Sequence, residues 1–190
     1  MKLGLYGGSF DPVHLGHLLV ARTAVEELGL DRLFFIPAAQ SPFKRDAQLA
    51  PVAARLQCLR LALAGHSDCE VDDQEIRRGG VSFSIETLRD YARRFPQAEL
   101  FYLIGADHAA KLDKWREPEE LARLAEFVVV PRPGGGVAHF PPSFRGRTLA
   151  GFPLGVSSSQ IRARVKAGRP IDLLVPPAVA EAIKNSNLYR

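Results

Sequence analysis

Short apolar runs alternate with helix-like patterns along the whole chain, and this alternation restricts the possible folds more than any other feature. The runs typical of strands cover residues 2–6, 33–37, 69–72, 100–104, 127–130 and, more weakly, 148–152. Helices are expected at 15–28, 52–64, 84–95, 106–113, 118–125, 158–167 and 177–185. Strands that alternate with helices indicate βαβ units and a parallel sheet. We therefore expect an α/β fold of three layers, with helices on both faces of the sheet and a small helical lobe at the C-terminal end.

The composition is that of a globular protein with one ordinary core. Of the 190 residues, 46% are hydrophobic and 24% are charged, which excludes disordered and collagen-like chains. No apolar run approaches the ~20 residues of a membrane span, and the apolar start is too short for a signal peptide. Two cysteines without a C-x-x-C pair favour a reducing compartment. We expect a single domain over residues 1–190, in the cytoplasm, without a membrane partner.

The charge balance narrows the partners only slightly. The formal net charge is +4, and this excess favours anionic ligands where the positive side chains cluster. By itself it does not indicate nucleic-acid binding, and no nucleic-acid partner is expected. One connection, residues 132–147, is longer than most loops in a compact domain and is either a mobile lid or a plain loop.

The turn after the first expected strand carries the clearest chemical signal. It joins that strand to the first helix, where open α/β sheets bind ligands and helix amides attract phosphate. His14 and His17 share one face of the helix. Three interpretations are compatible with this spacing: the histidines are metal ligands, ordinary packed residues, or hydrogen-bond donors to phosphate. A metal site would need further ligands at a defined spacing, so phosphate donors are favoured. The whole turn reads Gly7-Gly8-Ser9-Phe10-Asp11-Pro12-Val13-His14-Leu15-Gly16-His17.

A second stretch, residues 156–162, reads Val-Ser-Ser-Ser-Gln-Ile-Arg. Ser157 and Gln160 have the spacing of a capping box, so one interpretation is simply a well-formed helix start. Ser158, Ser159 and Arg162 add hydroxyl groups and a guanidinium to the free amides of that helix start, which is the composition of a phosphate site. Both interpretations stay open from these residues alone. The chain contains neither a P-loop nor a complete G-x-S-x-G nucleophile elbow.

Together the two stretches resemble the nucleotidylyltransferase superfamily with its H-x-G-H signature. More narrowly, the chain is similar to the bacterial nicotinate mononucleotide adenylyltransferases over residues 3–189. The narrower resemblance rests on the Ser-Pro-Phe-Lys of 41–44, the Ser-Phe-Ser-Ile-Glu-Thr-Leu of 82–88, the Leu-Ile-Gly-Ala-Asp of 103–107 followed by Trp115, the Val-Val-Val-Pro-Arg of 128–132, and the segment from Val175-Pro176 to Leu188-Tyr189.

This resemblance implies a Rossmann-like version of the fold and an enzyme of NAD biosynthesis. The enzyme would transfer the adenylyl group of ATP to nicotinate mononucleotide, giving nicotinate adenine dinucleotide and pyrophosphate. Mg²⁺ would be held by the ATP phosphates and not by protein ligands, as is common for this ion. A homo-oligomer is left open.

The resemblance also assigns site residues. Catalysis is implied for His14, His17, Lys44 and Arg162. Contacts with ATP are implied for these two histidines and Arg162 together with Gly7, Gly8, Ser9, Phe10, Gly105, Asp107, Ser157 and Ser158. Asp107 would hold a ribose. Contacts with the second substrate are implied for Ser9, Lys44, Thr87, Trp115 and Arg132, and Thr87 and Trp115 would frame the pyridine ring.

Alternatives remain for several of these positions. Without the resemblance, Lys44 is an ordinary surface lysine, Asp107 caps a helix and Trp115 is a core residue. Phe43 stands where the family commonly has histidine, so no phosphate contact is expected from that position. At the level of function, a pantetheine-phosphate adenylyltransferase and a catalytically silent nucleotide-binding regulator are the two rival hypotheses.

Overall fold

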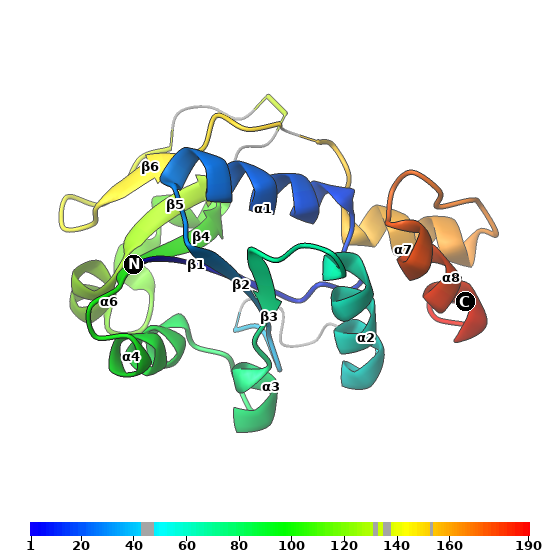
Figure 1. The fold of residues 1–190 in the computed structure, drawn as a ribbon, viewed down its shortest axis with the longest axis horizontal. Coiled ribbons are helices and arrows are strands. Elements are labelled where there is room, and N and C mark those ends of the chain that lie inside the picture. The colour runs from blue at the N-terminus through cyan, green and yellow to red at the C-terminus, as the bar shows by residue number, and fades with distance from the viewer. Residues whose placement is uncertain (43–47, 131–132, 135–137, 153) are drawn as a thin grey trace.

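The computed structural model describes residues 1–42, 48–130, 133–134, 138–152 and 154–190, and these form an α/β protein built on one sheet (Figure 1). In the described chain the sheet has six strands in the order β3-β2-β1-β4-β5-β6, and every neighbouring pair is parallel. The strands are β1 (Lys2–Gly8), β2 (Arg32–Pro37), β3 (Cys69–Val71), β4 (Glu99–Gly105), β5 (Glu126–Val130) and β6 (Gly146–Thr148). The expected parallel α/β sheet is confirmed.

Helices cover both faces of this sheet. Those of the described residues are α1 (Leu15–Leu28), α2 (Val52–Leu63), α3 (Gln74–Arg78), α4 (Ser84–Arg94), α5 (Ala106–Ala109), α6 (Pro118–Leu124), α7 (Ser158–Lys166), α8 (Pro177–Asn185) and a 3₁₀ turn η1 (Leu112–Lys114). One buried cluster lies between the sheet and α1 and α2, with contributions from α7 and α8. The second buried cluster lies between the opposite face and α4, α5, η1 and α6. The three-layer arrangement is therefore confirmed.

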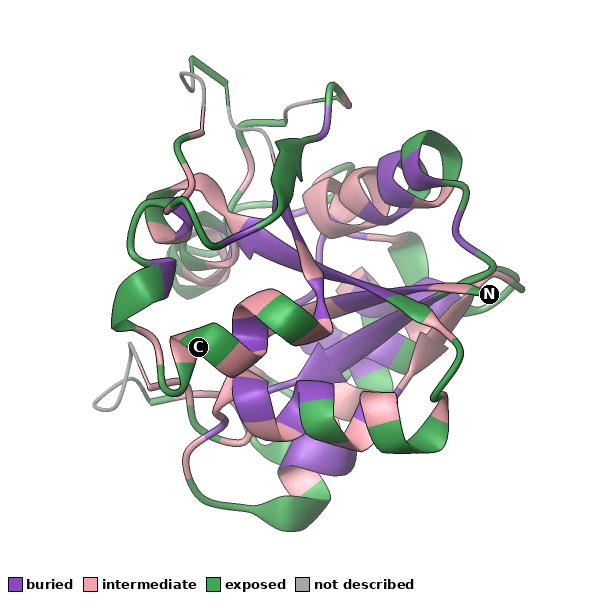
Figure 2. Ribbon diagram, turned by 90° about the vertical axis from the view of Figure 1, so that its left-hand side faces the viewer, coloured by how far each residue is buried: buried purple, intermediate pink, exposed green. Residues whose placement is uncertain are grey.

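The strands in the middle of the sheet supply apolar side chains to both clusters. Leu33 and Phe35 of β2 belong to the first cluster, whereas Phe34 and Ile36 belong to the second. Successive side chains of a strand point to opposite faces, so a strand buried on both sides needs an uninterrupted apolar run. Figure 2 shows these strands as the buried centre of the molecule.

The C-terminal lobe consists of α7 and α8, which lie beside the sheet in Figure 1. Ile161 of α7 and Val179 and Ile183 of α8 are buried in the same cluster as Leu59 of α2. The lobe is therefore held to the sheet domain by a shared core.

Three local expectations need correction. The edge strand occupies Gly146–Thr148 instead of 148–152. Its register with β5 is set by hydrogen bonds from Phe127 N–H to Arg145 O and from Leu149 N–H to Val129 O. The strand is exposed, so no apolar run in the sequence marks its position. The helix expected at 106–113 is split into α5 and η1. The third concerns α3, which is short and largely polar and therefore has no hydrophobic pattern that predicts a helix.

The order of the strands creates a switch point between β1 and β4. From β1 the chain continues outward through β2 and β3, and it then returns to β4 on the other side of β1. Connections therefore leave the carboxyl ends of these two neighbouring strands in opposite directions, which opens a crevice where such sheets bind ligands. No helix among the described residues is both long and apolar enough to cross a membrane.

Candidate functional site

A cavity of about 530 Å³ opens at this switch point. Its walls come from the turn after β1, the end of β4, the first turn of α1, residues within 149–152 and 154–156, and the start of α7. It brings together ten of the site residues expected from the sequence: Gly7, Gly8, Ser9, Phe10, His14, His17, Gly105, Ser157, Ser158 and Arg162. Two motifs separated by about 150 positions of sequence thus face one space.

The two histidines begin α1 as a stacked pair. Their ring centroids lie 3.7 Å apart at an interplanar angle of 24°. The backbone N–H of His14 donates to Nδ1 of His17 at 3.2 Å, so the neutral His17 ring carries its proton on Nε2, where it can donate to a ligand. Nδ1 of His14 is buried and has no hydrogen-bond partner among the described residues.

Burial keeps both imidazoles neutral in the free protein. It lowers the pKa of His14 to about 4. Burial, together with the neighbouring His14 ring, also lowers the pKa of His17 well below its usual range. A neutral imidazole still donates one hydrogen bond, and an approaching anion stabilises its protonated form. The pair is thus suited to an anionic ligand.

Close packing explains the glycines at 7, 8 and 16. A Cβ atom on Gly7 would lie 2.9 Å from the hydroxyl oxygen of Tyr102, and one on Gly8 would lie 3.0 Å from the Phe10 ring. A Cβ atom on Gly16 would lie 3.0 Å from both the His14 ring and the Val156 side chain. These glycines therefore let the turn and α1 pack closely against neighbouring side chains, of which Phe10, His14 and Val156 line the cavity.

A buried arginine that the sequence analysis missed supports the same turn. The side chain of Arg55 is 2% exposed, and its Nη1 donates to Ser9 O and to Ala38 O, each at 2.9 Å. Its Nε donates to Ala50 O at 3.3 Å. Arg55 thus ties the Ser9 carbonyl of the turn to residues 38 and 50, although in the sequence it is only one more polar residue of an ordinary helix.

The start of α7 is tied directly to the turn after β1. The capping box is confirmed: Ser157 Oγ accepts from Gln160 N–H at 3.3 Å, and Ser157 N–H donates to Gln160 Oε1 at 2.9 Å. Ser158 Oγ donates to Pro12 O at 2.9 Å. Arg162 Nη1 donates to the backbone oxygen of Asp11 at 2.7 Å. The serine and arginine of the second motif thus position the loop of the first motif.

Trp115 lines a smaller cavity of about 110 Å³, which is formed by the start of α4, the residues around the end of η1, and α6. The lining of this cavity is mainly apolar, and two cationic residues stand beside Trp115. The other lining residues are Pro42, Phe83, Ser84, Ile85, Lys114, Arg116 and Leu121. We call this space the Trp115 cavity.

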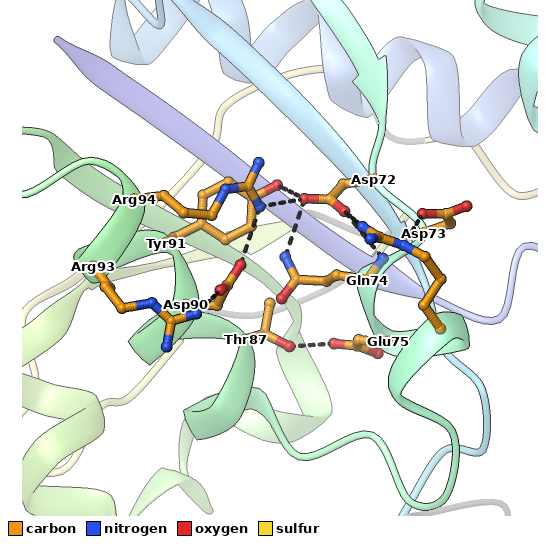
Figure 3. Close-up of polar contacts among 10 residues, drawn as sticks. Asp72, Asp73, Gln74, Glu75, Thr87, Asp90, Tyr91, Arg93 and Arg94 are labelled. Atoms are coloured by element: carbon orange, nitrogen blue, oxygen red, sulfur yellow. Dashed lines mark hydrogen bonds and ion pairs between the residues drawn. The ribbon is translucent and has the colours of Figure 1, made fainter.

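Thr87 does not line the Trp115 cavity. Its side chain is fully buried, and its hydroxyl donates to Glu75 Oε1 at 2.6 Å (Figure 3). Burial raises the pKa of Glu75. Because α4 begins at Ser84 and Glu86 N–H donates to Phe83 O, the N–H groups that lack partners within the helix belong to residues 83–85 and do not include that of Thr87.

The remaining expected residues fall into two groups. Asp107 is exposed in the first turn of α5, directly after Gly105. Lys44 and Arg132 lie outside the described residues, as does Phe43. Across the described part of the chain, no three His, Cys, Asp or Glu side chains gather as ligands for a metal ion.

The parallel sheet and the cavity at its switch point define an α/β protein of the class that binds ligands at the carboxyl ends of its strands, and the helix starts and Arg162 at this cavity suit an anion. A family model described as cytidylyltransferase-like matches residues 5–164. The "Probable nicotinate-nucleotide adenylyltransferase" of Thermus thermophilus is 43% identical, with all of both chains covered, and the protein of the same description from Opitutus terrae is 41% identical over all of this chain and 98% of its own length. The chain therefore belongs to the cytidylyltransferase-like family, among its nicotinate-nucleotide adenylyltransferases.

A solved structure supports the fold. The nicotinic acid mononucleotide adenylyltransferase of Plasmodium falciparum, complexed with NaAD, has a TM-score of 0.78 over 99% of this chain and 97% of its own. Its sequence identity is only 18%, so this likeness concerns the architecture.

Proposed function

We propose that the chain transfers the adenylyl group of ATP to nicotinate mononucleotide, with nicotinate adenine dinucleotide and pyrophosphate as products. The observation that carries the proposal is the meeting of the two motifs at one cavity: the His14–His17 pair and Arg162 line the same 530 Å³ space. Relatives of this description share about 40% of their residues with the chain over its full length. The activity places the enzyme in NAD biosynthesis.

The reaction needs positioning and electrostatic stabilisation more than a protein nucleophile. A phosphate oxygen of the mononucleotide attacks the α-phosphorus of ATP, a new P–O bond forms, and the bond to pyrophosphate breaks. His14, His17 and Arg162 would donate hydrogen bonds to phosphate oxygens. The amides of Gly16 at the start of α1 and of Ser158 and Ser159 at the start of α7 would add to their field. The two anions repel each other, so holding them together is itself a large part of the catalysis.

A divalent metal ion generally accompanies nucleotide phosphates in this family. We propose that it is Mg²⁺, held by the triphosphate and water, because phosphate oxygens and water are the ligands Mg²⁺ usually takes in such enzymes. It would neutralise charge on the leaving pyrophosphate.

We assign the pyridine ring of the acceptor to the Trp115 cavity. Its apolar walls suit an aromatic ring, and the free N–H groups at the start of α4 suit a carboxylate, which only accepts hydrogen bonds. In this assignment the amides of Ser84 and Ile85 are the donors, and Thr87, which does not line the cavity, does not frame the ring. Lys114 and Arg116 add positive charge beside the ring.

Three further roles complete the proposal. Asp107 holds a ribose, which its place directly after Gly105 at the end of β4 supports. Lys44 is assigned to the reacting phosphates and Arg132 to the acceptor, both on the resemblance alone.

The test measures pyrophosphate release from ATP and Mg²⁺ with nicotinate mononucleotide, nicotinamide mononucleotide or pantetheine phosphate as acceptor. We expect the first acceptor to be used best. Highest activity with pantetheine phosphate would establish the rival adenylyltransferase. Binding of ATP without pyrophosphate release from any acceptor would establish the silent regulator.

A further inference from the structure

Tyr189 connects the segment after α8 to the turn that carries His14. Its hydroxyl donates to Asp11 Oδ1 at 2.7 Å, across 178 positions of sequence. Burial raises the pKa of this hydroxyl, and the bond to Asp11 acts in the same direction, so Tyr189 remains a donor at neutral pH. Its backbone φ is +66°, a conformation that bulky side chains rarely adopt. The surroundings therefore hold the tyrosine in place at some conformational cost.

The carboxylate of Asp11 is buried and only partly satisfied. The residue is 1% exposed. Besides Tyr189, its Oδ1 accepts from the backbone N–H of Ala50 at 3.3 Å. Its Oδ2 is buried without a hydrogen-bond partner among the described residues. A buried carboxylate that lacks donors attracts any cation within reach.

Arg162 is such a cation, and it also faces the cavity. Its Nη1 lies 3.8 Å from Asp11 Oδ2 while donating to the Asp11 backbone oxygen, and its Nη2 lies 3.3 Å from Ser159 Oγ. Arg162 and the Asp11 carboxylate thus already form a long ion pair. A small rotation of the guanidinium would exchange the carbonyl contact for a direct hydrogen bond to the carboxylate, which is the stronger acceptor. Arg55, the other nearby cation, already donates to three backbone carbonyls.

We propose that Tyr189 is a positioning residue for Arg162. By donating to Asp11, Tyr189 reduces the attraction between the Asp11 carboxylate and the guanidinium, which leaves Arg162 available to the phosphates of ATP. Tyr189 itself does not touch the substrate in this arrangement and acts only through Asp11. The inference rests on the proposed function for the identity of the ligand as ATP.

The chain offers a closely matched control. Tyr91 is fully buried, and its hydroxyl donates to the carboxylate of Asp72 at the same distance of 2.7 Å (Figure 3). This pair belongs to a polar network with Gln74 and Arg94 at α3 and α4, away from the cavity residues. Tyr91→Phe and Tyr189→Phe therefore each remove one hydroxyl from one buried carboxylate.

The experiment compares ATP binding by calorimetry with the KM values of both substrates. We expect Tyr189→Phe to raise the Kd and KM for ATP about tenfold, the effect of losing roughly one hydrogen bond to a charged group. The KM for nicotinate mononucleotide should not change. Tyr91→Phe should lower the Tm but leave both KM values unchanged. An unaltered Kd for ATP in Tyr189→Phe, or an equal rise in Tyr91→Phe, would overturn the inference.

A second variant tests the link without removing the hydroxyl. Asp11→Asn keeps an oxygen for Tyr189 and removes the charge that attracts Arg162, so ATP affinity should be retained or increased. In that background Tyr189→Phe should no longer weaken ATP binding. Weaker ATP binding in Asp11→Asn alone would contradict the proposal, even if Tyr189→Phe does not fold. If no pyridine mononucleotide yields pyrophosphate, the proposed function fails, but the calorimetric affinities for ATP still decide the role of Tyr189.

Discussion

Burial of His14 predicts a loss of stability in mild acid. The pKa of this imidazole is lowered from 6.5 to about 4, so between these pH values the unfolded chain binds a proton that the folded chain does not. Stability therefore rises with pH across this window and is lost as the pH falls through it. One pKa unit corresponds to about 1.4 kcal/mol. The free energy of unfolding should thus decrease by about 2 kcal/mol between pH 7 and 5, and by about 3 kcal/mol once the pH reaches 4.

The assay is urea unfolding at pH 7, 6, 5 and 4 for the wild-type protein and His14→Gln. Other groups, including the carboxylates, contribute to both proteins, so the difference between the two pH profiles reports His14 together with its effect on the neighbouring His17 ring. His66→Gln, which replaces an exposed histidine outside the site, is the matched control. The reasoning is refuted if His14→Gln has the same pH dependence as the wild-type protein, because burial of His14 would then not oppose its protonation.

Three kinetic predictions concern the site. His17→Ala should lower kcat by about 10²- to 10³-fold, the usual effect of losing one preorganised donor to developing charge; near wild-type turnover in a folded variant would exclude a phosphate role. Arg162→Lys should raise the KM for ATP although the charge is kept, because a planar fork is replaced by a point charge; unchanged ATP kinetics would leave the start of α7 as an ordinary helix cap. The enzyme should prefer nicotinate over nicotinamide mononucleotide. Arg116→Gln should reduce this preference, measured as the ratio of the two kcat/KM values, roughly fivefold, since a half-exposed charge contributes about 1 kcal/mol. An unchanged ratio of kcat/KM would show that Arg116 does not help to select the acid.

The order of elements and the two motifs follow from local sequence patterns. The helices at 15–28 and 177–185 lie where the sequence analysis expects them. The capping box at Ser157 and Gln160 could be recognised because its partners are three positions apart. Each of these features depends on neighbours within one or two turns of chain, which is the range over which hydrophobic periodicity and capping act. The strands β2 and β4 could also be recognised locally, because a strand that is buried on both faces needs a continuous apolar run.

Packing alone decided which distant side chains meet. Nothing near Arg55 in the sequence indicates that it is buried against Ser9 and Ala38. Thr87 lies in a segment associated with the pyridine ring, yet the rotation of α4 against α3 turns its hydroxyl toward Glu75 and leaves the start of the helix to face the Trp115 cavity. Such contacts depend on how rigid elements dock, and many orientations are compatible with the same local pattern.

The pairing of Tyr189 with Asp11 is the clearest case. Each residue has an ordinary local environment in the sequence, and 178 positions separate them. The sequence determined that a phosphate-binding turn and a second helix start exist. Only the docking of α7 and α8 beside the sheet brings Arg162 and Tyr189 to the same buried carboxylate, because burial and charge compensation arise only after distant segments have excluded water from the space between them.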